Sequence, residues 1–130
     1  DFRFVTTKDG EATLEALHQA AAGAAAAVPG TRIELHGAIA RTPLERTATN
    51  VNLYREYAAC AKAAGLGDGE APLVGGGSDA SSTSAIGIPS IDGLGPRGSG
   101  FHTKEELIEA NTLVPKAEAI ARFLLGRFPH

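Results

Sequence analysis

The sequence predicts an α/β fold, in which a strand–helix–strand unit precedes a second unit of short apolar strands and helices. Residues 1–6 and 32–40 alternate polar and apolar side chains with the period of two that is typical of half-buried strands. Between them, residues 10–28 carry apolar side chains at helical spacing. Further along, residues 72–91 contain two short apolar runs separated by a glycine run and a helical segment, as in a covered sheet.

The first unit follows from its local signals. Phe2 and Phe4 point to one face of the first expected strand, and Asp9 is expected to cap the helix over 10–28. That helix carries a stripe at Leu14, Leu17, Ala21 and Ala24, and Pro29-Gly30 ends it. Ile33, Leu35 and Ile39 share one face of the second strand. Two strands and one helix leave an open sheet edge, so this unit is expected to need further strands from elsewhere.

The second unit begins after a polar connector at residues 41–47. A helix is expected over 50–64, with Leu53, Tyr57, Cys60 and Ala64 on one stripe. Short strands are expected at 72–74 and 88–91, and a helix at 79–86 between them. Residues 92–101 are glycine-rich and are expected to form a loop.

Two further features are expected at the carboxyl end. Thr103 and Glu106 have the spacing of a capping box, which predicts a helix start there. A last helix is expected over 112–127, with Ile120, Phe123 and Leu124 on its buried face.

Composition excludes several classes of protein. The 130 residues are 43% hydrophobic and 21% charged, and the net charge of -3 gives no general attraction to nucleic acid or to anionic membranes. No apolar run reaches the length of a membrane span. The single Cys60 is interpreted as a packing residue and suits a reducing, cytoplasmic compartment. Because the chain contains no Met and opens in what resembles the middle of a strand, its natural N-terminus is expected to precede Asp1.

The run Gly75-Gly76-Gly77-Ser78-Asp79 is the first candidate site. Glycines between a strand and a helix allow a ligand to approach the backbone closely, and a helix start favours an anion. The alternative is a tight turn in which Ser78 or Asp79 caps the helix. The run is neither a Walker A loop nor a dinucleotide fingerprint.

Histidine and arginine supply the other candidates. His102 ends the glycine-rich loop and could bind zinc, although a lone histidine there is more often a surface residue, and one ligand cannot complete a zinc site. The other histidines, His18, His36 and His130, are interpreted as solvated or capping residues. Arg3 and Arg41 could together bind a carboxylate if their strands are neighbours, or could be a pair of exposed arginines. Ser82 and Ser84 lie in no nucleophile motif.

The order of the glycine motifs carries a resemblance. Residues 75–80, then Gly87-Ile88-Pro89, then residues 93–96, then 98–103 with Glu106 beyond resemble the C-terminal signature of the M20 family of zinc metallopeptidases, which includes carboxypeptidase G2-like enzymes and aminoacylase-type amidohydrolases. The opening Asp1-Phe2-Arg3 resembles the Asp-x-Arg strand of that family's lid domain. The resemblance spans essentially the whole chain.

The resemblance implies a domain organisation. Residues 1–40 would be the second half of a ferredoxin-like lid, or dimerisation, domain, 41–47 a connector, and 48–130 the C-terminal part of an α/β catalytic domain that binds two zinc ions. His102 matches a zinc ligand of the family. Arg3 and Arg41 match the lid arginines that hold a substrate carboxylate, and Gly76, Gly77, Ser78 and Asp79 match the floor of the substrate pocket.

The same resemblance implies a function for the intact protein. It would cleave an amide or peptide bond next to a free carboxylate, with a zinc-activated water as nucleophile, and would form a homodimer through the lid. The family's His-x-Asp motif, Glu-Glu pair and further acidic ligand have no match in these 130 residues, so the chain alone is expected to be inactive and not to hold zinc tightly. The alternative is a non-catalytic module that binds a small anion or mediates dimerisation.

Overall fold

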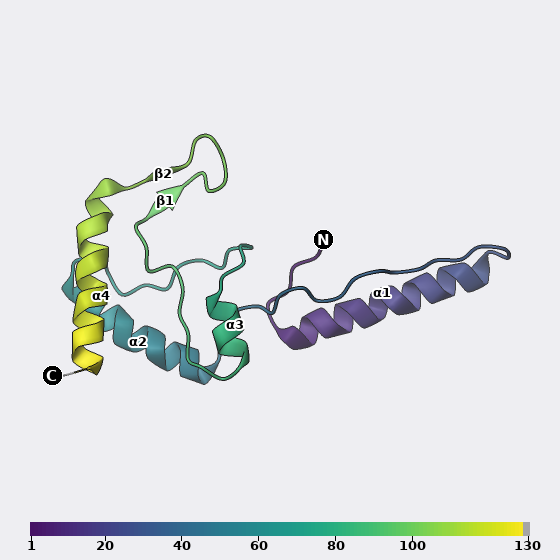
Figure 1. The fold of residues 1–130 in the computed structure, drawn as a ribbon, viewed down its shortest axis with the longest axis horizontal. Coiled ribbons are helices and arrows are strands. Elements are labelled where there is room, and N and C mark those ends of the chain that lie inside the picture. The colour runs from purple at the N-terminus through teal and green to yellow at the C-terminus, as the bar shows by residue number, and fades with distance from the viewer. Residues whose placement is uncertain (129–130) are drawn as a thin grey trace. The chain divides into compact units, whose positions relative to one another are not determined.

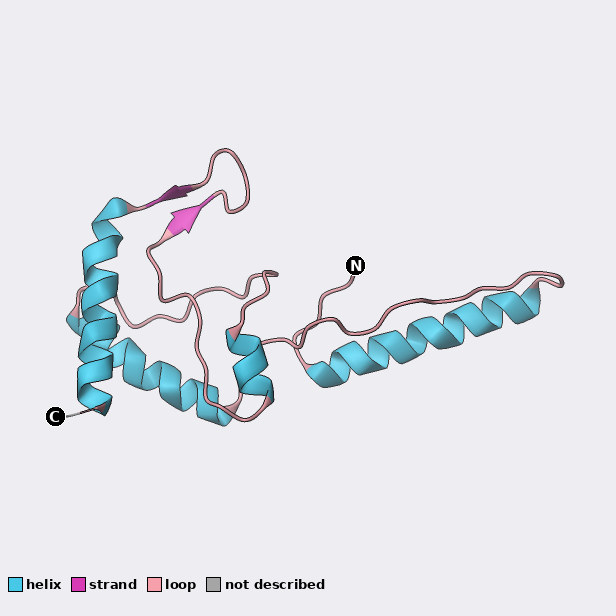
Figure 2. Cartoon of the chain, viewed as in Figure 1, coloured by secondary structure: helices cyan, strands magenta, loops and turns pink. Residues whose placement is uncertain are grey.

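The computed structural model describes residues 1–128 and divides them into two compact units. The first unit contains Asp1–Glu45 and Gly75–Ser90, and the second contains Arg46–Val74 and the residues from Ile91 onward. Helices form most of the regular structure in the described residues (Figures 1 and 2). Because residues 75–90 pack with residues 1–45, each unit is built from two separate stretches of sequence. The predicted domains of the whole protein stay a prediction.

Helix α1 (Thr7–Ala27) is the main element of the first unit. Its N-cap is Thr6, whose side chain accepts a hydrogen bond from the backbone N–H of Asp9. The prediction that Asp9 caps this helix is therefore wrong. Asp9 lies three residues inside and accepts a hydrogen bond from the Thr6 hydroxyl at 2.7 Å, so the two side chains form a reciprocal pair like a capping box.

The predicted strand at residues 1–6 is absent, although its alternation is visible in the burial. Phe2 and Phe4 are half-buried while Asp1, Arg3 and Val5 are exposed. The Phe4 ring packs onto Gly10 of α1 so closely that a Cβ there would lie 2.8 Å from the ring. The apolar face of this segment is therefore covered by a helix instead of a neighbouring strand.

The predicted strand at 32–40 is also absent. Thr31 donates to the carbonyl of Val28 at the end of α1, and Glu45 accepts from the backbone N–H and the hydroxyl of Thr7 at its start, both at 2.7 Å. The segment between them therefore returns along the helix as an extended chain (Figure 1). Ile33 and Leu35 are 46% and 43% exposed. Within residues 1–128 no ladder pairs this segment, and an extended chain without a ladder is not a strand.

Helix α3 (Ala80–Ala85) completes the first unit and is shorter than the predicted helix at 79–86. The predicted strands at 72–74 and 88–91 do not form. After α3 the chain turns back on the helix, because the backbone N–H of Ile88 donates to the carbonyl of Thr83 and the Thr83 and Ser90 hydroxyls are hydrogen-bonded at 2.6 Å.

The second unit is built on helices α2 (Ala48–Ala63) and α4 (Leu113–Arg127), which agree closely with the predicted helices at 50–64 and 112–127. Their contact forms the core around Tyr57, Ala61 and Ala119. The predicted stripe on α2 is confirmed, because Tyr57 is buried and Leu53, Cys60 and Ala64 are half-buried. On α4 the expected buried Leu124 is 47% exposed, and Ala119 occupies the centre of the contact instead.

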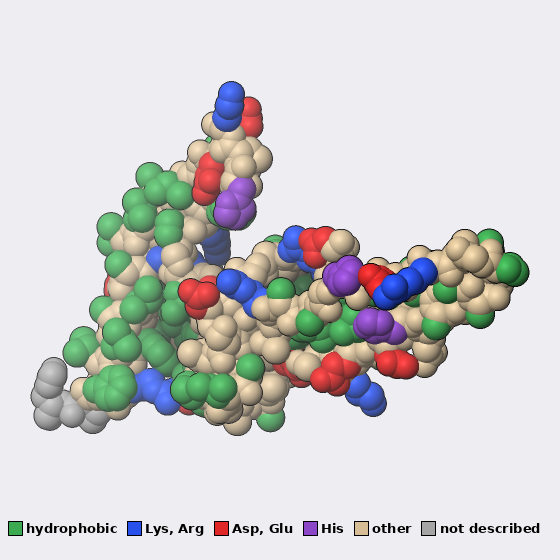
Figure 3. Space-filling view, turned by 45° about the vertical axis from the view of Figure 1, so that its right-hand side comes forward, with side chains coloured by type: hydrophobic (Ala, Val, Ile, Leu, Met, Phe, Trp, Pro, Cys, Tyr) green, Lys and Arg blue, Asp and Glu red, His purple; other side chains and the backbone are tan. Residues whose placement is uncertain are grey.

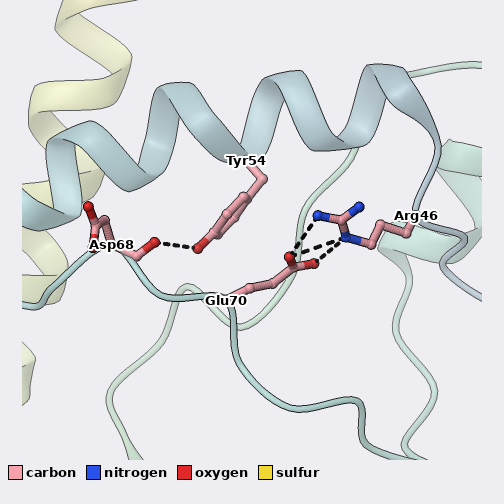
Figure 4. A network of polar contacts seen from close by, with 4 residues as sticks. All are labelled: Arg46, Tyr54, Asp68 and Glu70. Atoms are coloured by element: carbon pink, nitrogen blue, oxygen red, sulfur yellow. Dashed lines mark hydrogen bonds and ion pairs between the residues drawn. The ribbon is translucent and has the colours of Figure 1, made fainter.

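A polar network holds the chain after α2 against that helix (Figure 4). Arg46, just before the helix, binds both carboxylate oxygens of Glu70 at 3.1–3.2 Å. The Tyr54 hydroxyl donates to the backbone carbonyl of Asp68 at 2.8 Å, and Lys62 binds the Asp68 carboxylate. These contacts fix the path of residues 64–70.

The two strands of the described residues, β1 (Gly98–Ser99) and β2 (Leu107–Ile108), form an antiparallel hairpin in this unit. The predicted loop at 92–101 thus contains a strand. No helix starts at Thr103, contrary to the capping-box prediction, because residues 100–106 form the tip of the hairpin. After β2, the short 3-10 helix η1 (Ala110–Thr112) leads into α4.

Apolar side chains of α4 and β2 are exposed and form an apolar surface within the described residues (green in Figure 3). It includes Leu107, Ile108, Val114 and Leu125, each more than half exposed. Over residues 1–128, no helix has the combination of length and apolar character that crossing a membrane requires. The α/β fold class concerns a complete domain and stays a prediction.

Candidate functional site

The guanidinium group of Arg41 lies against the glycine run. Arg41 follows the extended segment that returns along α1, and its side chain is 55% exposed. A Cβ added to Gly77 would lie only 3.0 Å from the Arg41 Nη1 atom and 3.2 Å from its Cδ atom. Because these distances are tighter than ordinary van der Waals contacts, the absence of a side chain at Gly77 is what allows Arg41 to lie where it does.

Arg3 lies against the same run two residues earlier. A Cβ on Gly75 would be 3.4 Å from both the Cδ and the Nη1 atoms of Arg3, which is ordinary contact. The structure therefore brings the two predicted arginines to one glycine run, although neither the strand at 1–6 nor the strand at 32–40 forms. The sequence predicts that the two arginines meet only if their strands are neighbours. In the structure, Arg3 lies beside Gly75 and Arg41 lies beside Gly77 without any strand pairing.

Among residues 1–128, each of these arginines has one acidic neighbour. The Arg3 Nη2 atom lies 3.4 Å from an oxygen of Asp1, and the Arg41 Nη1 atom lies 3.7 Å from an oxygen of Asp79. Both pairs are on the surface, and the Asp79 side chain is fully exposed. Exposed pairs of this length contribute about 0–1 kcal/mol, so neither acid holds its arginine strongly.

Ser78 serves the backbone of α3. Its hydroxyl oxygen accepts a hydrogen bond from the backbone N–H of Ala80 at 3.2 Å, and its carbonyl accepts from the hydroxyl of Ser81 at 2.7 Å. Asp79 is the N-cap but makes no side-chain capping bond. The capping alternative for Ser78 is thus supported, and α3, with six residues, offers little of the anion site expected at a helix start.

His102 belongs to the second unit, at the tip of the β1–β2 hairpin. Its φ of 64° is left-handed, which is uncommon for a residue other than glycine. Its backbone N–H donates to the Glu106 carboxylate at 3.0 Å, and its side chain is exposed. The capping-box glutamate therefore binds the hairpin tip instead of a helix start.

The residues described do not by themselves fit a zinc site. Within 1–128 there is no group of three or more His, Cys, Asp or Glu side chains that could hold a metal ion, and zinc takes three or four protein ligands. His102 would supply one. Of the other histidines, His18 and His36 are exposed, and His36 lies 3.5 Å from Glu34. His130 lies outside the described residues.

The residues alone predict open space for a ligand at the glycine run, and the groups that approach the run are the chain's own arginines. Only the resemblance assigns the arginines and the glycines to one pocket. Arg41 and Gly77 are far apart in the sequence, so no local pattern signals their contact.

The chain was compared with known proteins at three levels. No protein-family model, curated protein or solved structure matches it.

Proposed function

We propose that the first unit binds a carboxylate at Arg3, Arg41 and the glycine run, as the carboxylate-recognition part of an M20-type zinc-dependent amide or peptide hydrolase. The observation that carries the proposal is the convergence of two guanidinium groups on Gly75 and Gly77. Guanidinium groups bind carboxylates through two parallel hydrogen bonds, and both arginines have only weak acidic neighbours to displace.

The ligand class follows from the site. Two exposed cations beside a backbone without side chains favour a small anion that can reach the main chain, such as an N-acyl amino acid or the C-terminal residue of a peptide. Ser78 and Asp79 border this site, with Ser78 holding the local turn and Asp79 pairing with Arg41. Gly76, which has open space at its Cβ position, is where the ligand would meet the backbone.

The hydrolytic part of the proposal rests on His102 and on the resemblance of the glycine motifs. Zinc, when bound in the intact enzyme, would activate the attacking water. Since the described residues offer a single candidate ligand, no hydrolytic step is derived for this chain. The uncovered apolar surface of α4 and β2 supports a larger catalytic domain, because apolar patches of this kind mark contacts with other segments.

Calorimetric titration of the 130-residue chain with N-acetyl-L-alanine tests the proposal. We expect binding of the carboxylate and none of N-acetyl-L-alaninamide, which lacks the negative charge. Arg3→Ala and Arg41→Ala should each weaken binding by about tenfold, whereas Arg55→Ala, an exposed arginine on α2, should not. Equal binding of acid and amide would refute carboxylate recognition. Turnover of the acid by the isolated chain with zinc added would contradict the proposal that this chain recognises the carboxylate while the catalytic centre needs the intact protein.

A second candidate is a non-catalytic module for anion binding or dimerisation. The observation in its favour is that the arginines and the glycine run all belong to one unit, and that residues 31–40 are extended without a ladder in the described chain. Sedimentation at several concentrations tests the dimer. Homodimerisation that Ile33→Lys abolishes, with carboxylate binding unchanged, would favour pairing through this segment.

A further inference from the structure

Asp79 and Gly77 contact the same guanidinium group in different ways, which suggests that they have opposite effects on the carboxylate site. Gly77 leaves room for Arg41, because a Cβ added at residue 77 would lie only 3.0 Å from Nη1. The Asp79 side chain is fully exposed, and its carboxylate lies 3.7 Å from Nη1, which is too long for a hydrogen bond. Gly77 therefore leaves the space that the Arg41 side chain occupies, and Asp79 faces the guanidinium group only loosely.

We propose that Gly77 is a positioning residue for Arg41 and that Asp79 is an internal competitor of the ligand's carboxylate for the same guanidinium group. This inference rests on the function proposed above and assigns to the two residues roles of opposite sign. Gly77 acts through Arg41 by leaving the space that the arginine side chain occupies. Asp79 sets how readily Arg41 exchanges its own partner for an external one.

The role of Gly77 follows from the space around it. An alanine methyl group at residue 77 would require the Arg41 side chain to shift by a few tenths of an ångström or more, because both Nη1 and Cδ are closer than ordinary contact. A bidentate contact depends on direction, so such a shift weakens carboxylate binding without removing the positive charge. Gly75 differs, since a methyl group there would meet Arg3 only at ordinary contact distance.

The role of Asp79 follows from its exposure and its distance. A carboxylate that makes no hydrogen bond and is fully solvated stabilises Arg41 only weakly. It nevertheless places a negative charge beside the guanidinium group that the ligand's carboxylate must bind. Two negative charges that share one guanidinium group repel each other. Removal of that charge should therefore strengthen ligand binding, which is the opposite of what an essential binding residue would show.

Titration of the 130-residue chain with N-acetyl-L-alanine separates the two roles. Gly77→Ala is expected to weaken binding about three- to tenfold, and Asp79→Asn to tighten it about two- to fivefold at low salt. The matched controls are Gly69→Ala, a loop glycine with open space around it, and Asp92→Asn, an exposed acid of the second unit. Neither control should change the affinity by more than the small effect of one unit of net charge.

A double-mutant cycle tests whether Gly77 acts through Arg41. In the Arg41→Ala background, Gly77→Ala should have no further effect on affinity, because the guanidinium group that it positions is gone. Far-UV circular dichroism of each variant shows whether it folds. Should Gly77→Ala fail to fold, Asp79→Asn and the cycle Asp79→Asn/Arg41→Ala still test the competitor role.

Each outcome has a distinct meaning. Absence of N-acetyl-L-alanine binding by the wild-type chain would overturn the proposed function itself. Binding that depends on Arg41 but is unchanged by Gly77→Ala, or is weakened by Asp79→Asn, would leave that function intact and overturn this inference. Additive effects of Gly77→Ala and Arg41→Ala would overturn the positioning role alone.

Discussion

Replacement of Tyr57 by Phe is expected to stabilise the second unit. Tyr57 is 6% exposed in the core between α2 and α4, and its hydroxyl oxygen is buried with no hydrogen-bond partner in the described residues. Its ring meets that of Phe123 edge-on, with centroids 6.0 Å apart. Phe keeps this packing and removes only the buried oxygen, which makes the substitution a direct measure of what that oxygen costs.

The magnitude follows from two opposing contributions. A buried hydroxyl without a partner costs about 1–3 kcal/mol relative to water. The space left by one oxygen, about 10–15 Å³, costs about 0.3 kcal/mol at about 24 cal/mol per Å³. The free energy of unfolding should therefore rise by about 1 kcal/mol, and the Tm by about 4 °C.

Tyr54 is the matched control, since it lies on the same helix and its hydroxyl donates to the Asp68 carbonyl at 2.8 Å. Tyr54→Phe should lower the free energy of unfolding by about 1 kcal/mol, because it removes this hydrogen bond. Urea denaturation followed by the helix signal in far-UV circular dichroism measures the free energy of unfolding of both variants. A loss of stability in Tyr57→Phe equal to that in Tyr54→Phe would refute the claim that the Tyr57 hydroxyl is unpaired.

Three further substitutions test individual contacts. Glu45→Gln should lower the free energy of unfolding near neutral pH. Hydrogen bonds from Thr7 hold the pKa of Glu45 below its ordinary value of 4.5, so the wild-type protein has the full stabilisation above that value. In urea titrations, the difference in free energy of unfolding between the two proteins should therefore disappear as the pH falls through the lowered pKa. Gly98→Ala should open the hairpin, because a Cβ there would lie 2.4 Å from a carbonyl oxygen of β2, and faster amide exchange in both strands with α2 unchanged would show it. Ala119→Leu should destabilise the core by about 1–3 kcal/mol in thermal melts, since Ala119 is fully buried, while Ala121→Leu on the exposed face should cost little.

The helices could be predicted from the sequence because their signals are local. Apolar spacing and capping residues lie within the segment that folds, so α2 and α4 agree with expectation to within two residues at their ends. The sequence does not determine the capping residue of α1, because Thr6 and Asp9 are both good N-caps and both lie near the helix start.

The strands could not be predicted in the same way, because a strand exists only with a partner. Alternation at residues 1–6 correctly indicates which side chains are covered, but the cover is Gly10 of α1. At residues 32–40 the same pattern is present while Ile33 and Leu35 stay exposed. Residues 98–99 and 107–108, by contrast, pair without an alternating signal, since the glycine at 98 permits the close approach.

At the candidate site, the residue types could be predicted from the sequence, but their positions relative to one another could not. Its components, two arginines and a glycine run, are visible in the sequence, and their chemistry favours an anion whatever the fold. Their juxtaposition depends on α1, because the contacts at its two ends direct residues 31–45 back along the helix and place Arg41 over Gly77. We therefore expect the pair of hydrogen bonds from Thr7 to Glu45 to help position the guanidinium group from a distance. Weakening of carboxylate binding by Glu45→Gln would follow from this connection, whereas loss of stability with unchanged affinity would show that these hydrogen bonds are not needed to position Arg41.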